Sequence, residues 1–195
     1  YYTITKSWNY MNEKYYLNSD IEEIKNNLNK SLKYFSGKKF LISGANGFLG
    51  KYFIKTLLLI NTDLKKKVKI IAIDIKFDKS EIYLDKNVIK IKQDINNIKK
   101  INHKCDYVLH AAGIPSPKHY FNKPIDAIFT SITGTKKLLE YSKKNKSKFI
   151  FFSSSEIYGN PDKKNIPTKE TYNGNVSCIE DRSCYDEGKR VGETL

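Results

Sequence analysis

The feature that most restricts the fold is an apolar run of strand length that leads directly into three evenly spaced glycines. The run begins at Phe40 within an expected strand 39–43, and Gly44, Gly47 and Gly50 follow in the pattern G-x-x-G-x-x-G. An amphipathic segment of helical length comes next. In α/β folds such a unit holds a pyrophosphate: the first glycine permits the turn, the second lets the backbone approach the ligand, and the third lets the helix pack on the strand. This glycine turn (residues 44–50) therefore predicts a dinucleotide site.

A second strand supports this prediction, because it ends in an acid at a suitable distance. Residues 68–74 are apolar apart from Lys69 and the closing Asp74, which lies 24 residues beyond Gly50. A carboxylate that binds the ribose hydroxyls is expected roughly 20 residues after the glycines. Its charge repels a 2′-phosphate and favours NAD over NADP, although Lys76 leaves NADP open. Without this acid, the glycines would indicate no more than a flexible loop.

Beyond residue 37 strands and helices alternate, which is typical of a parallel sheet covered by helices. The expected fold class is α/β, a Rossmann-type doubly wound parallel sheet. The expected strands are residues 39–43, 68–74, 88–93, 107–110 and 148–152. The expected helices are residues 48–60, 124–144 and a last one from about residue 183. On the helix 124–144 the buried side would carry Ile125, Ile128, Ile132, Leu138, Leu139 and Tyr141.

The residues before this pattern are expected to form a helical extension. Ser19 and Asp20 would cap a helix whose apolar residues recur every three or four positions over residues 21–35. Gly37 would end that helix. No residue pattern typical of a catalytic or binding site occurs in this part of the chain.

The domain organisation predicted is an N-terminal helical extension, residues 1–36, and an NAD-binding Rossmann domain, residues 37–195. The sequence starts without methionine and stops at Leu195 inside an expected helix. These ends predict a fragment that lacks a C-terminal substrate-binding part. We expect it to keep a cofactor cleft and to turn over no substrate.

The net charge of +14 raises the question of nucleic-acid binding. Only two of the 35 basic residues, Arg182 and Arg190, are arginines, and the lysines are spread along the whole chain. Arginine is the side chain that usually contacts bases and phosphates in a planar, two-pronged geometry. We therefore expect a solvated basic surface and no nucleic-acid partner.

The three cysteines and three histidines show no spacing typical of a disulfide framework or a metal site, so no metal is expected. No apolar run is long enough to span a membrane, and the start of the sequence lacks the apolar core of a signal peptide. A cytoplasmic location without a membrane partner is the simplest expectation.

A second informative spacing lies near the end of the sequence, where Tyr185 precedes Lys189 by four residues. On a helix these side chains share a face. A nearby cation favours the phenolate and lowers the pKa of the tyrosine, as a base that works near neutral pH requires. Alone, the pair is more often an ordinary surface contact, and the serines at 153–155 are equally typical of a helix cap. Their order after the glycine turn favours an active site.

Together these residues resemble the extended short-chain dehydrogenase/reductases that modify nucleotide sugars. The resemblance spans about residues 38–195, nearly all of the chain beyond the extension. The motifs that carry it are the glycine turn, Asp74, Asp94-Ile95, His110-Ala111-Ala112, the serine strand end and Tyr185-x-x-x-Lys189. Further stretches are similar to the UDP-glucuronate decarboxylases, the UDP-xylose synthases: residues 115–125, 155–161, 174–176 and 182–190.

The resemblance implies a role for each motif. NAD would be held by Gly44, Asn46, Gly47, Phe48, Leu49, Gly50, Asp74, Asp94, Ile95, Ala111 and Ala112, together with Tyr185 and Lys189. The catalytic residues would be Tyr185, Lys189, Ser154 and Glu156. Tyr185 would remove the proton of the sugar C4 hydroxyl, the 4-keto sugar would lose carbon dioxide, and the returning hydride would give UDP-xylose. A UDP-sugar substrate and a homodimer are implied as partners.

Two adjacent residues separate related chemistries. The family's 4,6-dehydratases typically carry an aspartate acid where Ser155 stands, and its 4-epimerases typically lack the glutamate at Glu156. Two departures from the family are residues 177–181 and Ser131, which stands where many relatives carry asparagine. A 4-epimerase or 4,6-dehydratase remains an alternative, as does a non-catalytic dinucleotide-binding protein on the same fold.

Overall fold

The computed structural model of the chain describes the backbone from residue 13 to residue 195, and the side chains from residue 18 onward. The part of the predicted extension before residue 13 lies outside the described residues. In the part that is described, no helix is both long and apolar enough to cross a membrane.

Five parallel strands form one sheet in the order β3-β2-β1-β4-β5. They are β1 Lys39–Ser43, β2 Lys69–Asp74, β3 Val88–Lys92, β4 Tyr107–His110 and β5 Lys148–Phe151. The order reverses between β1 and β4, and ligands of open α/β sheets bind where the strand order reverses, beyond the carboxyl ends of the strands. Ser43 is in register with both Ile73 and His110, so these strands end at the same edge. The predicted doubly wound Rossmann fold is confirmed.

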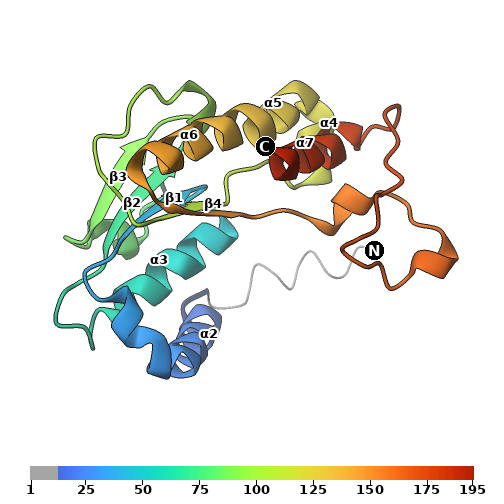
Figure 1. Cartoon of the computed structure of the whole chain (residues 1–195). Coiled ribbons are helices and arrows are strands. Elements are labelled where there is room, and N and C mark those ends of the chain that lie inside the picture. Colours follow the sequence, from blue (N-terminus) through green and yellow to red (C-terminus); the bar gives the residue numbers. More distant parts are fainter. Residues whose placement is uncertain (1–12) are drawn as a thin grey trace.

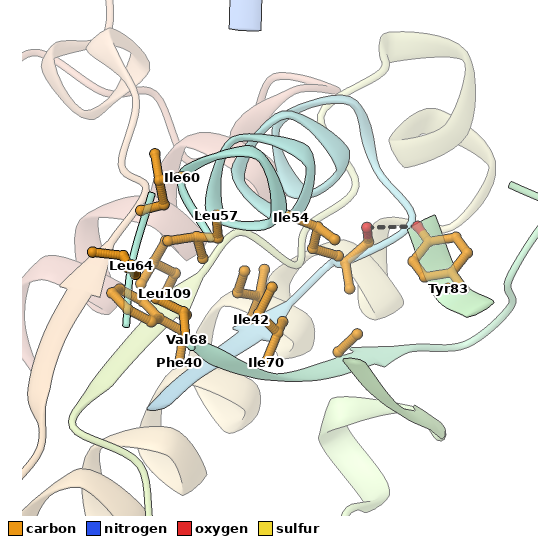
Figure 2. Packing of buried hydrophobic residues seen from close by; sticks show 12 residues of the cluster. Phe40, Ile42, Ile54, Leu57, Ile60, Leu64, Val68, Ile70, Tyr83 and Leu109 are labelled. Carbon is orange, nitrogen blue, oxygen red and sulfur yellow. Dashed lines mark hydrogen bonds between the residues drawn. The ribbon is translucent and has the colours of Figure 1, made fainter. Parts of the chain in front are cut away.

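Helices cover both faces of the sheet (Figure 1). On one face lies α3 Phe48–Ile60, with α2 Glu13–Leu28 packed on its outer side. On the other lie α5 Pro124–Phe129, α6 Thr135–Asn145 and α7 Ser183–Thr194. The core beneath α3 joins that helix to the sheet (Figure 2) and includes Phe40, Ile42, Ile54, Leu57, Ile60, Val68, Ile70 and Leu109. The core on the opposite face includes Leu41, Ile71, Val108 and Leu138.

The predicted helix 124–144 is present as continuous helical backbone over 124–145, but it is not a regular α-helix throughout. A π-helical turn, Thr130–Gly134, lies between α5 and α6, and a further helix, α4 Pro117–Asn122, precedes them. The Thr130 hydroxyl donates a hydrogen bond to the Asp126 carbonyl at 2.7 Å, which competes with the regular helical pattern. A π turn contains an extra residue and therefore shifts the helical face. Ile125, predicted to be buried, is 68% exposed.

Short 3-10 helices complete the chain. They are Asn29–Phe35, Glu81–Leu84, Ile95–Asn97, Ser155–Tyr158 and Lys163–Asn165. Ile95–Asn97 and Ser155–Tyr158 position side chains of the site described below, and Glu81–Leu84 carries Tyr83, which contacts its glycine turn.

The N-terminal helix differs from its prediction at its start. Helix α2 begins at Glu13 and runs through Ser19 and Asp20, so these residues do not cap it. The Asp20 carboxylate instead accepts a hydrogen bond of 2.6 Å from the hydroxyl of Tyr52 on α3. Lys25 of α2 forms a 3.0 Å ion pair with Asp63 just beyond α3. The extension is thus fastened along α3, and its separation at residue 37 as a domain stays a prediction.

Candidate active site

The glycine turn lies between β1 and α3, and the three glycines meet different steric demands. Gly44 has a φ of +69°, and a Cβ there would lie 2.6 Å from the backbone of Ala111. A Cβ on Gly50 would overlap the carbonyl oxygen of Gly44. A Cβ on Gly47 would meet only that same oxygen, at 3.1 Å. Gly44 and Gly50 are therefore needed for the fold of the turn. Gly47 is not, and its lack of a side chain instead lets a ligand approach the backbone of the turn.

The start of α3 offers hydrogen-bond donors beyond this turn. Gly47 is the N-cap and contributes no side chain to cap the helix. The backbone N–H groups of the first helical residues, which include Phe48 and Leu49, have no acceptor within an α-helix. Together with the positive end of the helix dipole, such groups bind phosphate. The side chains of Phe48 and Leu49 are exposed, at 68% and 44%.

A cavity of about 310 Å³ lies beside the turn at the carboxyl edge of the sheet. Five of the predicted cofactor residues line it together: Gly44, Asp74, Asp94, Ile95 and Ala112. The sequence analysis missed other lining residues: Ile73, Ile75, Gln93, Asn96, Gly113, Ile114, Lys123, Asp126 and Thr130. Lys123 and Asp126 flank the start of α5, and no motif marks them.

The two predicted acids of this cavity, Asp74 and Asp94, are already oriented by backbone groups. The Asp74 carboxylate accepts hydrogen bonds from the N–H groups of Asn46, at 2.8 Å, and Lys76, at 3.3 Å. Asp94 accepts from the N–H of Asn96 at 2.8 Å. Ionised carboxylates accept several hydrogen bonds, so both retain capacity for hydroxyl or amino groups. A cavity with two fixed acceptors beside a phosphate-binding turn fits a dinucleotide.

Tyr185 and Lys189 lie on α7, which carries them to the end of β5. Lys189 is 6% exposed, and its ammonium donates a hydrogen bond of 2.5 Å to the carbonyl of Phe152. The same ammonium lies 5.9 Å from the centre of the Tyr185 ring. Burial lowers the pKa of Lys189 to about 8. The Tyr185 ring stacks on Tyr120, with ring centres 5.5 Å apart.

Two glycines on α7 allow this helix to pack closely against the π turn and β5. A Cβ on Gly188 would lie 3.2 Å from the side chain of Ser131 in the π turn, and one on Gly192 would lie 2.5 Å from the Phe151 ring. The helix therefore contacts the π turn on one side and β5 on the other. Ser131 faces a glycine here, and its small side chain fits a helix packed at this distance.

Glu156 is linked to the start of α7 by Arg182, and Ser154 is hydrogen-bonded to Glu156. The Ser154 hydroxyl accepts a hydrogen bond of 3.3 Å from the Glu156 N–H at the start of the 3-10 helix Ser155–Tyr158. The Glu156 carboxylate forms an ion pair with Arg182, whose Nε also donates to Asp186 at 3.0 Å. The bond to Glu156 is the main reason that the pKa of Arg182 is raised, whereas burial raises the pKa of Asp186.

A buried histidine lies beneath these groups. His110 is fully buried at the end of β4, and its Nδ1 lies 2.7 Å from the Ser43 hydroxyl. Burial, together with the charge of Lys189, lowers the pKa of His110 to about 3. The imidazole is therefore neutral near pH 7 and joins β1 to β4.

The predicted site residues thus fall into two groups. One lines or borders the 310 Å³ cavity, and the other, Ser154, Glu156, Tyr185 and Lys189, surrounds α7 and does not line it. A larger hollow of about 570 Å³ lies around Tyr158, Tyr172 and Arg190, and no predicted site residue lines it. Sequence reasoning did not assign Arg182 to the site. Its helical spacing of three and seven from Tyr185 and Lys189 is a signal that could have found it.

The model of the NAD dependent epimerase/dehydratase family matches residues 40–195. The chain belongs to this family. The resemblance inferred from the motifs is thereby confirmed at family level, and so is the expected cofactor, since the family's own description names NAD.

Curated relatives and solved structures agree with this assignment. UDP-glucuronic acid decarboxylase 1 of Arabidopsis thaliana is 33% identical over 80% of this chain and 35% of its own length. UDP-glucuronic acid decarboxylase 5 of the same plant is 35% identical over 82% of this chain and 46% of its own length. The UDP-N-acetylglucosamine 4-epimerase of Methanobrevibacter ruminantium has a TM-score of 0.62 and 28% identity over 82% of this chain and 49% of that one. The chain therefore spans less than half the length of these relatives.

Proposed function

We propose that the protein containing this chain is an NAD-dependent enzyme that decarboxylates UDP-glucuronate to UDP-xylose. The observation that carries the proposal is the link from Glu156 through Arg182 to α7, which also bears Tyr185 and Lys189. A glutamate after Ser155 distinguishes the decarboxylases within the resemblance. Curated relatives at 33% and 35% identity are named UDP-glucuronic acid decarboxylases, which supports the same chemistry.

The cofactor would be held at the glycine turn. The N–H groups at the start of α3 would bind its pyrophosphate, Asp74 its ribose and Asp94 its adenine end. When bound, NAD supplies a hydride acceptor for the sugar C4 and later returns that hydride. The protein's contribution is therefore to orient the sugar and to move protons.

Tyr185 would take the proton from the C4 hydroxyl. Lys189 is held by the Phe152 carbonyl beside the Tyr185 ring. With a pKa of about 8, Lys189 is mostly a cation at pH 7, and a cation fixed beside the ring stabilises the phenolate form of Tyr185. Ser154 would hydrogen-bond the C4 oxygen as it becomes a ketone.

The ketone at C4 stands β to the carboxylate at C5, which makes decarboxylation possible. The bond from C5 to the carboxylate breaks, and its electron pair is delocalised into an enolate at C4. Reprotonation at C5 and return of the hydride to C4 complete UDP-xylose, with one carbon dioxide released. Glu156, fixed by Arg182, would orient the ring or assist the reprotonation. Ser155 has no acidic proton with which to expel a hydroxyl as a dehydratase must.

The deciding experiment follows the substrate carboxylate. The full-length protein is incubated with NAD⁺ and UDP-glucuronate labelled with ¹³C at the carboxylate. We expect labelled carbon dioxide, UDP-xylose and no net NADH. Tyr185→Phe keeps the ring that stacks on Tyr120 and should abolish turnover. A 4-epimerase, which the related solved structure favours, would keep the label in a six-carbon product, and that result would overturn decarboxylation.

A homodimer is the assembly we propose, through an apolar stripe on α4 and α5. Phe121, Ile125 and Phe129 recur every four residues and are 52%, 68% and 52% exposed. A second copy would cover this stripe. Ile125→Lys should convert a dimer to a monomer in analytical ultracentrifugation, whereas Leu84→Lys, at an exposed leucine on another element, should not. A wild-type protein that is monomeric at all concentrations contradicts the proposal.

A further inference from the structure

The loop after β2 is joined to the glycine turn by a buried tyrosine. Tyr83 lies in the 3-10 helix Glu81–Leu84 and is 3% exposed. Its ring packs edge-on against Phe77, with ring centres 4.9 Å apart, and belongs to the core beneath α3. Its hydroxyl donates to the Ala45 carbonyl at 2.9 Å (Figure 2, dashed line). A core residue thus presents one polar atom directly to the turn.

The same hydroxyl also lies 3.1 Å from the side-chain oxygen of Asn46. That oxygen accepts a second hydrogen bond, from the Asp78 N–H at 3.3 Å, which defines the orientation of the amide. Asp78 in turn forms an ion pair with Lys51 in the first turn of α3. The loop therefore contacts the glycine turn through the backbone, through Asn46 and through α3.

One peptide unit is held from both sides. The Ala45 carbonyl accepts from Tyr83, and the N–H of the same peptide, that of Asn46, donates to Asp74 at 2.8 Å. Rotation of this peptide would break both hydrogen bonds together. It would also change the path of the backbone into Gly47 and the start of α3. Tyr83 and Asp74 therefore constrain the shape in which the turn meets a pyrophosphate.

Tyr83 is suited to act as a permanent donor. Burial raises its pKa, and the charges of Asp78 and Asp74 add to this effect. The hydroxyl therefore stays protonated over the whole physiological pH range. Ala45 is fully buried, so no water replaces the donor if the hydroxyl is removed.

We propose that Tyr83 is a positioning residue for the cofactor: its hydroxyl holds the Ala45–Asn46 peptide in the orientation that binds the NAD pyrophosphate. The inference rests on the proposed binding of NAD at the glycine turn. It assigns a role to a residue outside every motif of the sequence. It also gives Asp74 a second role: besides binding the ribose, its carboxylate holds the N–H of the same peptide.

The test compares two tyrosines that undergo the same substitution. Tyr83→Phe removes the hydroxyl and keeps the ring. Tyr141→Phe is the matched control, because the Tyr141 hydroxyl also donates to a backbone carbonyl, that of His103, at 2.5 Å and away from the turn. Calorimetric titration of each full-length variant with NAD⁺ gives the dissociation constant. Loss of one donor to a buried carbonyl should weaken NAD⁺ binding about tenfold in Tyr83→Phe, and Tyr141→Phe should match the wild type.

Amide exchange in the protein without NAD⁺ supplies a second readout. The Asn46 N–H should exchange about tenfold faster in Tyr83→Phe than in the wild type or in Tyr141→Phe, because the peptide is no longer held at its carbonyl. Adding Asp74→Ala to Tyr83→Phe should weaken binding by less than the product of the single effects, since both act on one peptide.

The outcomes separate the two proposals. Equal affinities in Tyr83→Phe and Tyr141→Phe, with a wild type that binds NAD⁺, overturn the role of Tyr83 and leave the cofactor site intact. A wild type that does not bind NAD⁺ overturns the cofactor site and the role of Tyr83 with it. Slower binding alone, with unchanged affinity and exchange, also contradicts the proposal.

Discussion

Replacement of Lys189 by methionine should stabilise the fold while it removes activity. Lys189 is 6% exposed, and its ammonium lies 4.8 Å from the centre of the Phe151 ring and 5.9 Å from that of the Tyr185 ring. The ammonium donates a hydrogen bond to the Phe152 carbonyl. Burial of a cation with so few partners lowers its pKa from the ordinary 10.5 to about 8. Methionine has a similar length and no charge to bury. The difference in stability between Lys189→Met and the wild type therefore measures the free-energy cost of burying the ammonium.

The magnitude follows from the difference in pKa between the folded and unfolded chains. A pKa of about 8 in the folded chain against 10.5 in the unfolded chain means that the unfolded chain binds the proton more tightly. The free energy of unfolding is then lowered by about 3 kcal/mol at pH 7, where both states are protonated. Loss of the hydrogen bond to Phe152 offsets about 1 kcal/mol of the gain in the variant. A net stabilisation of about 2 kcal/mol remains at pH 7.

Because the pKa of Lys189 is lower in the folded chain than in the unfolded chain, the stability gain of Lys189→Met should depend on pH. Between pH 8 and 10.5 the folded chain has released the proton of Lys189 and the unfolded chain still holds it, so the stability of the wild type rises with pH. At pH 9.5 the cost of the charge falls to less than half of its value at pH 7, and most of the advantage of Lys189→Met is lost.

Urea denaturation at pH 7.0 and pH 9.5 measures both values. Lys143→Met, at an exposed position on α6, is the matched control and should show the same small difference from the wild type at both pH values. Lower stability of Lys189→Met at pH 7, or a stability difference that does not change with pH, would refute the reasoning. Turnover should be lost in either case, because the cation beside Tyr185 is gone.

Three further predictions concern the cofactor turn and the arginine link. Gly47→Val should abolish NAD⁺ binding and cost at most about 1–2 kcal/mol of stability, whereas Gly44→Ala, at a φ of +69°, should cost several, as thermal melts and NAD⁺ titrations would show. Asp74→Ala should weaken NAD⁺ binding about tenfold or more and raise the preference for NADP⁺, and an unchanged ratio of the two affinities would contradict its role. Arg182→Gln should free Glu156 and lower kcat about tenfold with NAD⁺ affinity unchanged, and unchanged kcat would refute the link.

The sheet and the glycine turn could be predicted because local spacing determines them. An apolar strand, the glycines at positions 44, 47 and 50, and an acid after the next strand each involve neighbours in sequence. The parallel direction of the strands follows from the alternation of strands and helices. This part of the site therefore required no knowledge of distant contacts.

The π turn inside the helix shows where such reasoning stops. The side chains at 125–141 have the period of one regular helix, which gives no sign of the π turn Thr130–Gly134, where the Thr130 hydroxyl bonds to the carbonyl four residues earlier. Gly134 then packs against Ile95, from a distant part of the chain. Tyr83 is a similar case: its hydroxyl acts 38 residues away, on Ala45, and no local pattern distinguishes it from any buried tyrosine.

The two arginines explain how helix α7 is held in place. The chain uses lysine for almost all of its cations, yet Arg182 and Arg190 are both next to or on α7. Arg182 bonds Glu156 and Asp186 at once, and Arg190 donates to the carbonyls of Ile157, at 2.7 Å, and Asn173, at 3.0 Å. A lysine is a single point donor on a flexible stem, whereas the planar guanidinium binds two acceptors in a fixed geometry.

Tyr185 and Lys189 lie between these two arginines along α7. Each arginine ties the helix to the 3-10 helix Ser155–Tyr158, one at Glu156 and the other at Ile157. The segment that begins at Ser154 is therefore coupled to the helix that carries the proposed base. Lysines on the surface raise the net charge of the chain without marking a site, whereas both partly buried arginines bind acceptors of the segment that contains Ser154 and Glu156. The positions of the two arginines therefore indicate the site better than the net charge does.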